Sequence, residues 1–282
     1  MKAYRGRPGI FESKGSAKKA AELEVKNLSL SFGGIKALNE VDICVHTGEL
    51  VAVIGPNGAG KTSLLNCMTG FYRPQTGRIV FNGKDITHLP PHHLVRIGIG
   101  RTFQNIELFP GMTVLSNMLL ARHNHCKYGI PGACLFSSSV RKEEVHQRRV
   151  IEELIDFLEI QAIRKKKVGS LPYGLMKRVE LGRALALEPA LLILDEPFAG
   201  MNLEEKEDMV RFLVEMNRAW GQTMILVEHD MSIVMSISER IVVLNSARSW
   251  PKDVRMRSVN IRKSSRHISV IPEVHKRRCM HW

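Results

Sequence analysis

The stretch that decides the fold of this 282-residue chain is Gly55-Pro56-Asn57-Gly58-Ala59-Gly60-Lys61-Thr62. It fits the pattern G-x-x-x-x-G-K-[S/T], whose glycines let backbone N–H groups curl around phosphate oxygens. The apolar run 50–54 predicts a strand covered on both faces. Residues 61–68 predict a helix whose positive N-terminal end faces the phosphate. A plain glycine-rich turn would not require this context, so we expect a phosphate-binding loop that extends to Ser63.

A second candidate site is the acid pair Asp195 and Glu196, which follows the apolar run 191–194. Two acids after a strand are usually loop residues, but here a phosphate loop is predicted on the same sheet. We therefore expect Asp195, with Thr62, to hold Mg²⁺, and Glu196 to polarise an attacking water. Lys61 would reach the β- and γ-phosphates.

The rest of the chain alternates between strand and helix patterns. Strands are predicted at 23–32, with a bulge near Lys26-Asn27, and at 41–45, 50–54, 191–194, 224–227 and 240–244. A turn is predicted at Gly33-Gly34. Helical spacing covers 61–68, 143–160 and 203–220, with a short helix from Met231. This alternation predicts an α/β fold with a parallel sheet.

Composition narrows the class of protein. Hydrophobic residues make up 44% of the chain, enough for one α/β domain with a small subdomain. No apolar run approaches the length of a membrane helix, the N-terminus does not resemble a signal peptide, and five scattered cysteines favour reduced thiols in a cytosolic protein. The net charge of +13 arises at the two ends, 1–20 and 247–282. The balanced remainder argues against nucleic acid as a partner.

Further segments complete a recognisable set of motifs. Gln104, Leu171-Pro172-Tyr173-Gly174 and His229, together with the two sites above, resemble the motifs of ABC-transporter ATPases in order and spacing, over about residues 23–244. Residues 98–114, in which the glutamine follows Arg-Thr-Phe, are similar to one member of the pair of ATPases in branched-chain amino acid importers. Gly200-Met201-Asn202 fits the same group.

The resemblance implies a role for each matching residue. Phe32 would stack on the adenine of ATP, although ordinary strand packing is the alternative. Gln104 would sense Mg²⁺ and the attacking water, and would link them to the membrane partner. His229 would contact the γ-phosphate. Gly174 would bind the nucleotide held by the opposite subunit, and residues 200–202 would lie at the partner interface. Asn202 is also a good helix N-cap.

The resemblance also implies an architecture and an assembly. The fold would be a P-loop NTPase with a RecA-like parallel sheet, an N-terminal antiparallel β subdomain and an inserted α-helical subdomain. The nucleotide-binding core would comprise 22–104 and 178–246, and the helical subdomain 105–177, which ends in the signature loop. Residues 1–21 would form a basic disordered tail in front of the nucleotide-binding core. The cofactors would be ATP and Mg²⁺, and the partners two membrane permeases, a second related ATPase and, indirectly, a periplasmic substrate-binding protein. The subunit would lie peripherally on the cytoplasmic face of the inner membrane.

The signature loop departs from the family pattern. The family commonly has Leu-Ser-Gly-Gly-Gln where this chain has Leu171-Pro172-Tyr173-Gly174-Leu175. Pro172 lacks both a hydroxyl and a backbone N–H, and Leu175 lacks a side-chain amide. Gly174 and a helix N-terminus expected near Met176 remain. We therefore expect a weakened composite site in the partner subunit.

The C-terminus departs as well. In the family, a strand like 241–244 is followed by a glycine turn and a short α/β ending, but here no glycine follows Gly221. Residues 247–282 are rich in Arg, Ser and Lys. One interpretation is a divergent disordered tail. We favour a frameshift near residue 246, because back-translation in a shifted frame can yield a peptide that resembles the family's ending. The gene sequence would decide between the two.

Three other functions stay open. The chain could energise import of another small solute, such as urea or an amide. It could instead be a non-transport ABC ATPase acting on ribosomes or DNA, although such proteins often carry two cassettes or a long coiled coil. A binding-only regulatory subunit is a third possibility, against which Lys61, Asp195, Glu196 and His229 argue.

Overall fold

The computed structural model describes residues 20–125, 138–245, 257–264 and 267–272. Nearly all of the expected basic tail at 1–21, and part of 247–282, lie outside these ranges. The chain divides into two compact units. The sheet unit comprises Lys18–Arg101, Ala190–Glu196 and Met216–Trp282, and the helical unit comprises Thr102–Pro189 and Pro197–Glu215, with Met1–Ala17.

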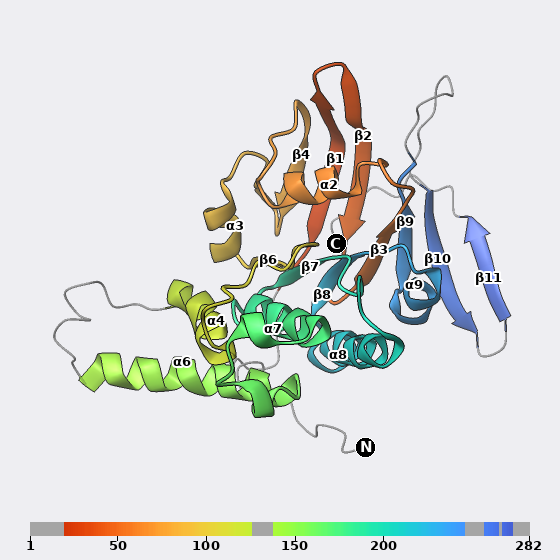
Figure 1. Ribbon diagram of the computed structural model, residues 1–282. Coiled ribbons are helices and arrows are strands. Elements are labelled where there is room, and N and C mark those ends of the chain that lie inside the picture. The colour runs from red at the N-terminus through yellow and green to blue at the C-terminus, as the bar shows by residue number, and fades with distance from the viewer. Residues whose placement is uncertain (1–19, 126–137, 246–256, 265–266, 273–282) are drawn as a thin grey trace. The chain divides into compact units, whose positions relative to one another are not determined.

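The sheet unit is built on a seven-stranded sheet with the order β11-β10-β9-β3-β8-β7-β6 (Figure 1). The strands β3 (Leu50–Ile54), β6 (Ile99–Arg101), β7 (Leu191–Asp195), β8 (Thr223–Val227) and β9 (Arg240–Val243) are parallel to one another. Every residue of β7 and β8 is buried, which explains their continuous apolar sequences. The predicted parallel sheet is confirmed.

Helices cover both faces of this sheet. Alternation along β3 directs Val51 and Val53 into one apolar cluster, which includes Leu64 and Leu65 of α2 (Lys61–Met68). It directs Ala52 to the other face, where Val234 of α9 (Met231–Ile237) packs. The predicted helices at 61–68 and from Met231 are therefore present, and the first lies directly after the phosphate loop.

A second, antiparallel sheet has the order β2-β1-β4-β5 and consists of β1 (Leu23–Phe32), β2 (Ile35–Val45), β4 (Thr76–Phe81) and β5 (Lys84–Asp85). The register between β1 and β2 shifts between Val25 and Leu28, and Asn27 has a φ of 47°. This is the bulge predicted near Lys26-Asn27. Gly33 has a φ of 57° in the predicted turn between the two strands. The short helix α3 (Pro91–Arg96) also belongs to the sheet unit.

The helical unit contains α4 (Val114–Ala121), η1 (Arg122–His125), α6 (Ser138–Phe157), η2 (Gln161–Ile163), η3 (Val168–Ser170) and α7 (Tyr173–Leu185). Leu158, just past α6, and Met118 of α4 pack so closely on Gly182 of α7 that a Cβ there would lie 2.8 Å from each. The helix α8 (Leu203–Trp220) begins in the helical unit and ends in the sheet unit. The predicted fold class, with its antiparallel and helical additions, is confirmed.

The start of α7 differs from the prediction. We expected a helix N-terminus near Met176, but α7 begins at Tyr173 and Pro172 is its N-cap residue, with φ −55° and ψ 150°. The proline ring sets φ and removes an N–H that the first turn does not need, so Pro172 favours an early start. As a result Gly174 lies within the first turn.

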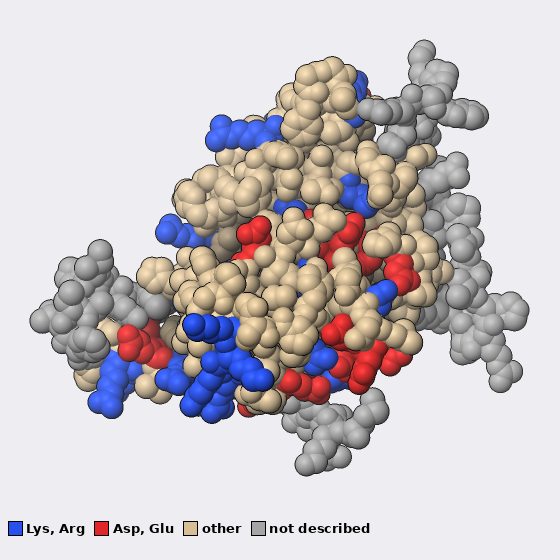
Figure 2. Space-filling view, in the orientation of Figure 1, with Lys and Arg blue, Asp and Glu red and all other residues tan. Residues whose placement is uncertain are grey.

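Two strands occur in the basic C-terminal segment. β10 (Arg257–Ser264) pairs antiparallel with β9, and β11 (His267–Pro272) pairs antiparallel with β10. On the face shown in Figure 2, the densest group of basic side chains lies at the lower left, and most of the acidic side chains lie at the centre and lower right.

Arg122 is a buried cation of the helical unit and supports a stability prediction. Its side chain is 3% exposed, its Nε donates to Gln147 Oε1 at 2.6 Å, and its Nη1 donates to Glu188 Oε1 and to the Ala186 carbonyl at 2.8 Å. Arg122→Met would leave these acceptors without that donor, and should lower the free energy of unfolding by about 3–5 kcal/mol. The measurement is urea denaturation followed by circular dichroism.

A matched control is Arg149→Met, which removes a pair with Glu153 from a side chain that is 77% exposed. It should shift the free energy of unfolding by less than about 0.5 kcal/mol. Equal denaturation midpoints for the two variants would contradict the role given to Arg122.

Candidate nucleotide-binding site

The loop 55–60 between β3 and α2 has a backbone that requires glycine. Gly58 and Gly60 have φ values of +80° and +90°. A Cβ on Gly60 would lie 2.3 Å from the Ala37 carbonyl oxygen, and one on Gly55 would lie 2.3 Å from that of Leu244. Gly60 is also the N-cap of α2 and has no side chain with which to cap it, so the first-turn N–H groups can bind an anion.

Lys61 lies over this loop. Its Nζ donates to the carbonyl oxygens of Gly55, at 2.7 Å, and Pro56, at 3.1 Å, and the residue is 8% exposed. Thr62 is exposed and Ser63 is half-buried, whereas Ala59 is buried against the core. Pro56, Asn57 and Gly58 form the exposed rim of the loop. The loop therefore joins a lysine ammonium, a hydroxyl and a helix N-terminus, the groups that bind a polyphosphate.

Asp195, the last residue of β7, and Glu196 directly after it lie at the edge of the parallel sheet at which β3 runs into the phosphate loop. Only β8 separates the two strands. Asp195 is 2% exposed, and its Oδ2 accepts a hydrogen bond from Arg101 Nη2 at 2.8 Å. Glu196 has a φ of 46°, in the left-handed region that non-glycine residues rarely adopt, and its N–H donates to the Val227 carbonyl at 3.0 Å. Strain of this kind is concentrated at functional sites.

His229 comes after β8, the strand that lies between β3 and β7. Its ring is 67% exposed, and its backbone N–H donates to Glu228 Oε2 at 3.0 Å. The carboxylate of Glu228 is 1% exposed and lies 3.7 Å from His229 Nδ1. The buried Glu228 carboxylate therefore fixes the backbone of His229 at the sheet edge that carries the phosphate loop.

Phe32, at the end of β1, is 48% exposed. Its ring centroid lies 5.1 Å from that of Tyr72, at an interplanar angle of 74°. Tyr72, also exposed, was not among the predicted residues. The aromatic pair Phe71-Tyr72 directly after Gly70 was the available signal for it.

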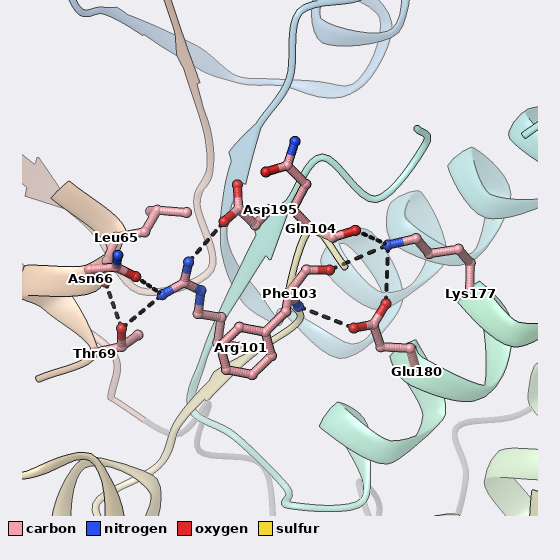
Figure 3. Close-up of polar contacts among 9 residues, drawn as sticks. All are labelled: Leu65, Asn66, Thr69, Arg101, Phe103, Gln104, Lys177, Glu180 and Asp195. Atoms are coloured by element: carbon pink, nitrogen blue, oxygen red, sulfur yellow. Dashed lines mark hydrogen bonds and ion pairs between the residues drawn. The ribbon is translucent and has the colours of Figure 1, made fainter. Parts of the chain in front are cut away.

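Gln104 belongs to the helical unit, where buried charges hold its backbone (Figure 3). Lys177 Nζ donates to the carbonyls of Gln104, at 3.0 Å, and Phe103, at 3.3 Å, and pairs with Glu180 at 3.2 Å. Glu180 Oε1 accepts from the Phe103 N–H at 3.2 Å. Burial raises the pKa of Glu180, and the charge of Lys177 opposes that rise. The sequence analysis missed Lys177 and Glu180.

Gly174 and Gly200 are also in the helical unit. A Cβ on Gly174 would lie 2.1 Å from Glu205 Oε1, and one on Gly200, whose φ is +74°, would lie 2.8 Å from Tyr173 Cε1. Asn202 Oδ1 accepts from the Glu205 N–H at 2.9 Å, and Glu205 Oε2 accepts from the Asn202 N–H at 3.0 Å. This reciprocal pair is a capping box, which confirms Asn202 as the N-cap of α8.

The structure thus brings most predicted site residues into the sheet unit: Phe32, the phosphate loop, Lys61, Thr62, Ser63, Asp195, Glu196 and His229. Gln104, Gly174 and Gly200 lie in the helical unit. Arg101, the partner of Asp195, is a further residue that the sequence analysis missed, although the run Arg101-Thr102-Phe103-Gln104 was used to identify the subgroup.

Comparison with known proteins agrees with this arrangement. A family model described as ABC transporter matches residues 38–199. The high-affinity branched-chain amino acid transport ATP-binding protein BraF of Pseudomonas aeruginosa is 38% identical over 237 residues, which cover 83% of this chain and 93% of BraF. LivG of Escherichia coli K12, which carries the same description, is 36% identical over the same shares.

Solved structures show the same fold. A nucleotide-free ATP-binding cassette from an ABC transporter has a TM-score of 0.68 and 34% identity, covering 80% of this chain and 88% of that one. The ADP conformation of the cassette MJ1267 has the same score and identity, covering 79% and 87%. Since the family model spans more than half of the chain, and relatives above 30% identity cover most of it, this protein belongs to the ATP-binding subunits of ABC transporters.

Proposed function

We propose that this chain binds and hydrolyses ATP to energise an importer of branched-chain amino acids. The observation that carries the proposal is the position of Lys61, whose ammonium lies in a glycine loop at the sheet edge that also bears Asp195 and Glu196. The solute assignment rests on the printed functions of BraF and LivG.

The residues present fit a magnesium nucleotide. The loop is too tight for any side chain at 55 or 60, and the oxygens of Thr62 and Asp195 are the ligands that Mg²⁺ prefers. Thr62, Asp195 and Gln104 would hold the ion, which supplies charge neutralisation on the phosphate oxygens when bound. Lys61 and the α2 N-terminus bind and orient the phosphates, and Phe32 stacks on the adenine.

Hydrolysis on this arrangement depends mainly on positioning and electrostatics. Glu196 orients the attacking water and polarises its O–H bond, and His229 contacts the γ-phosphate. The buried carboxylate of Glu228 accepts the backbone N–H of His229 and so holds the backbone of this residue in place. The water oxygen then forms the bond to the γ-phosphorus as the bond to the leaving ADP oxygen breaks, and Glu196 accepts the proton that the water loses.

We further propose that each site is closed by a second cassette. The loop that ends in Gly174, at the start of α7, would bind the γ-phosphate held by the partner, and a related cassette, MJ0796, has been solved as a dimer. Residues 200–202 would lie at this interface. The other partners would be two permeases, which Gln104 and the helical unit contact, and a periplasmic substrate-binding protein acting through them.

The proposed location is the cytoplasmic face of the inner membrane, held there by the permeases. Over the described residues, no helix combines the length and apolar character needed to span a bilayer. Import of another small solute, such as urea or an amide, is the alternative, since the solute does not touch this subunit. Co-purification with permeases rather than with ribosomes or DNA would separate transport from non-transport roles.

Lys61→Met removes the ammonium from the loop. Hydrogen bonds to charged groups contribute about 1.5–3 kcal/mol, so the affinity for ATP should fall about tenfold to a hundredfold in isothermal titration. Lys36→Met, at an exposed lysine on β2, is the control and should bind ATP like the unmodified chain. Undiminished binding by Lys61→Met would refute the proposed site.

Glu196→Gln keeps the shape of the side chain but removes the base. ATP affinity should stay within about twofold, while turnover falls about 10²–10⁴-fold, measured by phosphate release. Glu204→Gln, at an exposed carboxylate in the first turn of α8, should change neither. Turnover by Glu196→Gln at the unmodified rate would remove the base assignment.

Leu175→Gln tests the departure in the signature loop. Leu175 is only half-buried, so a glutamine can be accommodated and would supply the missing amide to the partner's γ-phosphate. The ATPase rate of the assembled transporter should rise several-fold. Leu175→Met, which adds no hydrogen-bonding group, should leave the rate as it is, and an unchanged rate in the glutamine variant would contradict the weakened site.

A further inference from the structure

Arg101, the last residue of β6, bonds through its guanidinium to two different elements of the sheet unit (Figure 3). Nη2 donates to Asp195 Oδ2 on β7 at 2.8 Å. Nη1 donates to Asn66 Oδ1 at 2.6 Å and to Thr69 Oγ1 at 3.1 Å, on and just after α2. The side chains of Arg101 and Asp195 are 7% and 3% exposed, so the ion pair is screened little by solvent.

The acceptors on the helix side are themselves held in place. The Thr69 hydroxyl donates to the Leu65 carbonyl at 2.7 Å, which leaves its oxygen lone pairs for Arg101. The Asn66 carbonyl accepts the N–H groups of Phe71 and Tyr72, at 2.8 and 3.0 Å, and so fixes the end of the helix. Arg101 therefore links β7 to the end of α2, which these hydrogen bonds fix, and we call this link the brace.

Both braced elements carry a proposed ligand of Mg²⁺. Asp195 is on β7, and Thr62 is at the N-terminus of α2. Thr62, Asn66 and Thr69 are spaced by four and then three residues, so they share one face of the helix. Mg²⁺ demands near-ideal octahedral geometry at about 2.1 Å, so a small change in the separation of the two oxygens would be costly.

We propose that Arg101 is a positioning residue that sets the separation of Thr62 and Asp195, and thereby the contribution of Mg²⁺ to nucleotide binding. The proposal rests on the magnesium site proposed above. An arginine is required, because its planar fork presents separate N–H groups to Asp195 and to Asn66, whereas a lysine ammonium can serve only one of them well.

The test compares the affinity for ATP in excess Mg²⁺ with the affinity in EDTA, by competition with a fluorescent ATP analogue. In Arg101→Met the ratio of the two affinities should fall about tenfold, the effect expected when an outer-shell partner of a metal site is lost. Binding in EDTA should stay within about twofold. An unchanged ratio, or an equal loss with and without Mg²⁺, overturns the proposal.

Two further variants separate the brace from simple charge and from folding. Arg101→Lys keeps the cation near Asp195 but should recover less than half of the lost ratio, and full recovery would overturn the brace. Asn66→Ala leaves Arg101 and Asp195 intact, and should still lower the ratio, by a smaller factor, because the guanidinium loses its anchor on α2. It remains informative should Arg101→Met fold poorly, and an unchanged ratio in this variant overturns the proposal.

Arg240→Met is the matched control. Arg240 bonds to Glu49 at 2.7 and 2.9 Å in the same unit, but at the amino ends of β3 and β9, away from the phosphate loop. Arg240→Met should lower the stability of the protein and leave the ratio of the two affinities unchanged. A lowered ratio in this variant would show that general destabilisation is enough to explain the effect of Arg101→Met. Asp195→Asn separates a failure of the role given to Arg101 from a failure of the magnesium site. If Asp195→Asn lowers the ratio while Arg101→Met does not, only the role of Arg101 is refuted. If Asp195→Asn leaves the ratio unchanged, the magnesium site is refuted as well.

Discussion

The backbone of the phosphate loop leaves no room for a side chain at Gly55 or Gly60, and the sheet unit around the loop imposes this restriction. The loop is wedged between the Ala37 carbonyl of β2 and the Leu244 carbonyl after β9. These carbonyls come from the antiparallel and the parallel sheet respectively, so both sheets shape the loop. The antiparallel sheet therefore helps to shape the phosphate loop, and its strand β1 also carries Phe32. Glycine at 55 and 60 is the condition for both contacts.

Buried charges perform related tasks in the two units. In the sheet unit, Arg101 joins Asp195 to the helix that follows the phosphate loop. In the helical unit, Lys177 and Glu180 of α7 hold the backbone of Phe103 and Gln104. Because Lys177 and Gly174 belong to one helix, the loop proposed to bind the partner's nucleotide and the backbone of Gln104 share a single support.

Much of this arrangement could be predicted from the sequence, and the successes have a common physical origin. The apolar run of β3, the glycine pattern of the loop and the helical start at Lys61 are local signals that need no knowledge of partners. The bulge near Asn27 was visible as a change of parity along β1. The start of α7 was predicted three residues too late. The prediction considered what Pro172 lacks, a hydroxyl, and overlooked that a proline is well suited to be the last extended residue before a helix.

What the sequence by itself determined is the phosphate loop, the acid pair and the strands and helices next to them, since these depend on periodicity and on residues close together in the chain. Only the tertiary structure decided which buried groups meet. Arg101 and Asp195 are 94 residues apart, and Lys177 and Gln104 are 73 apart. A buried arginine or lysine must find acceptors, but the sequence does not state which ones, because they are supplied by strand order and helix packing.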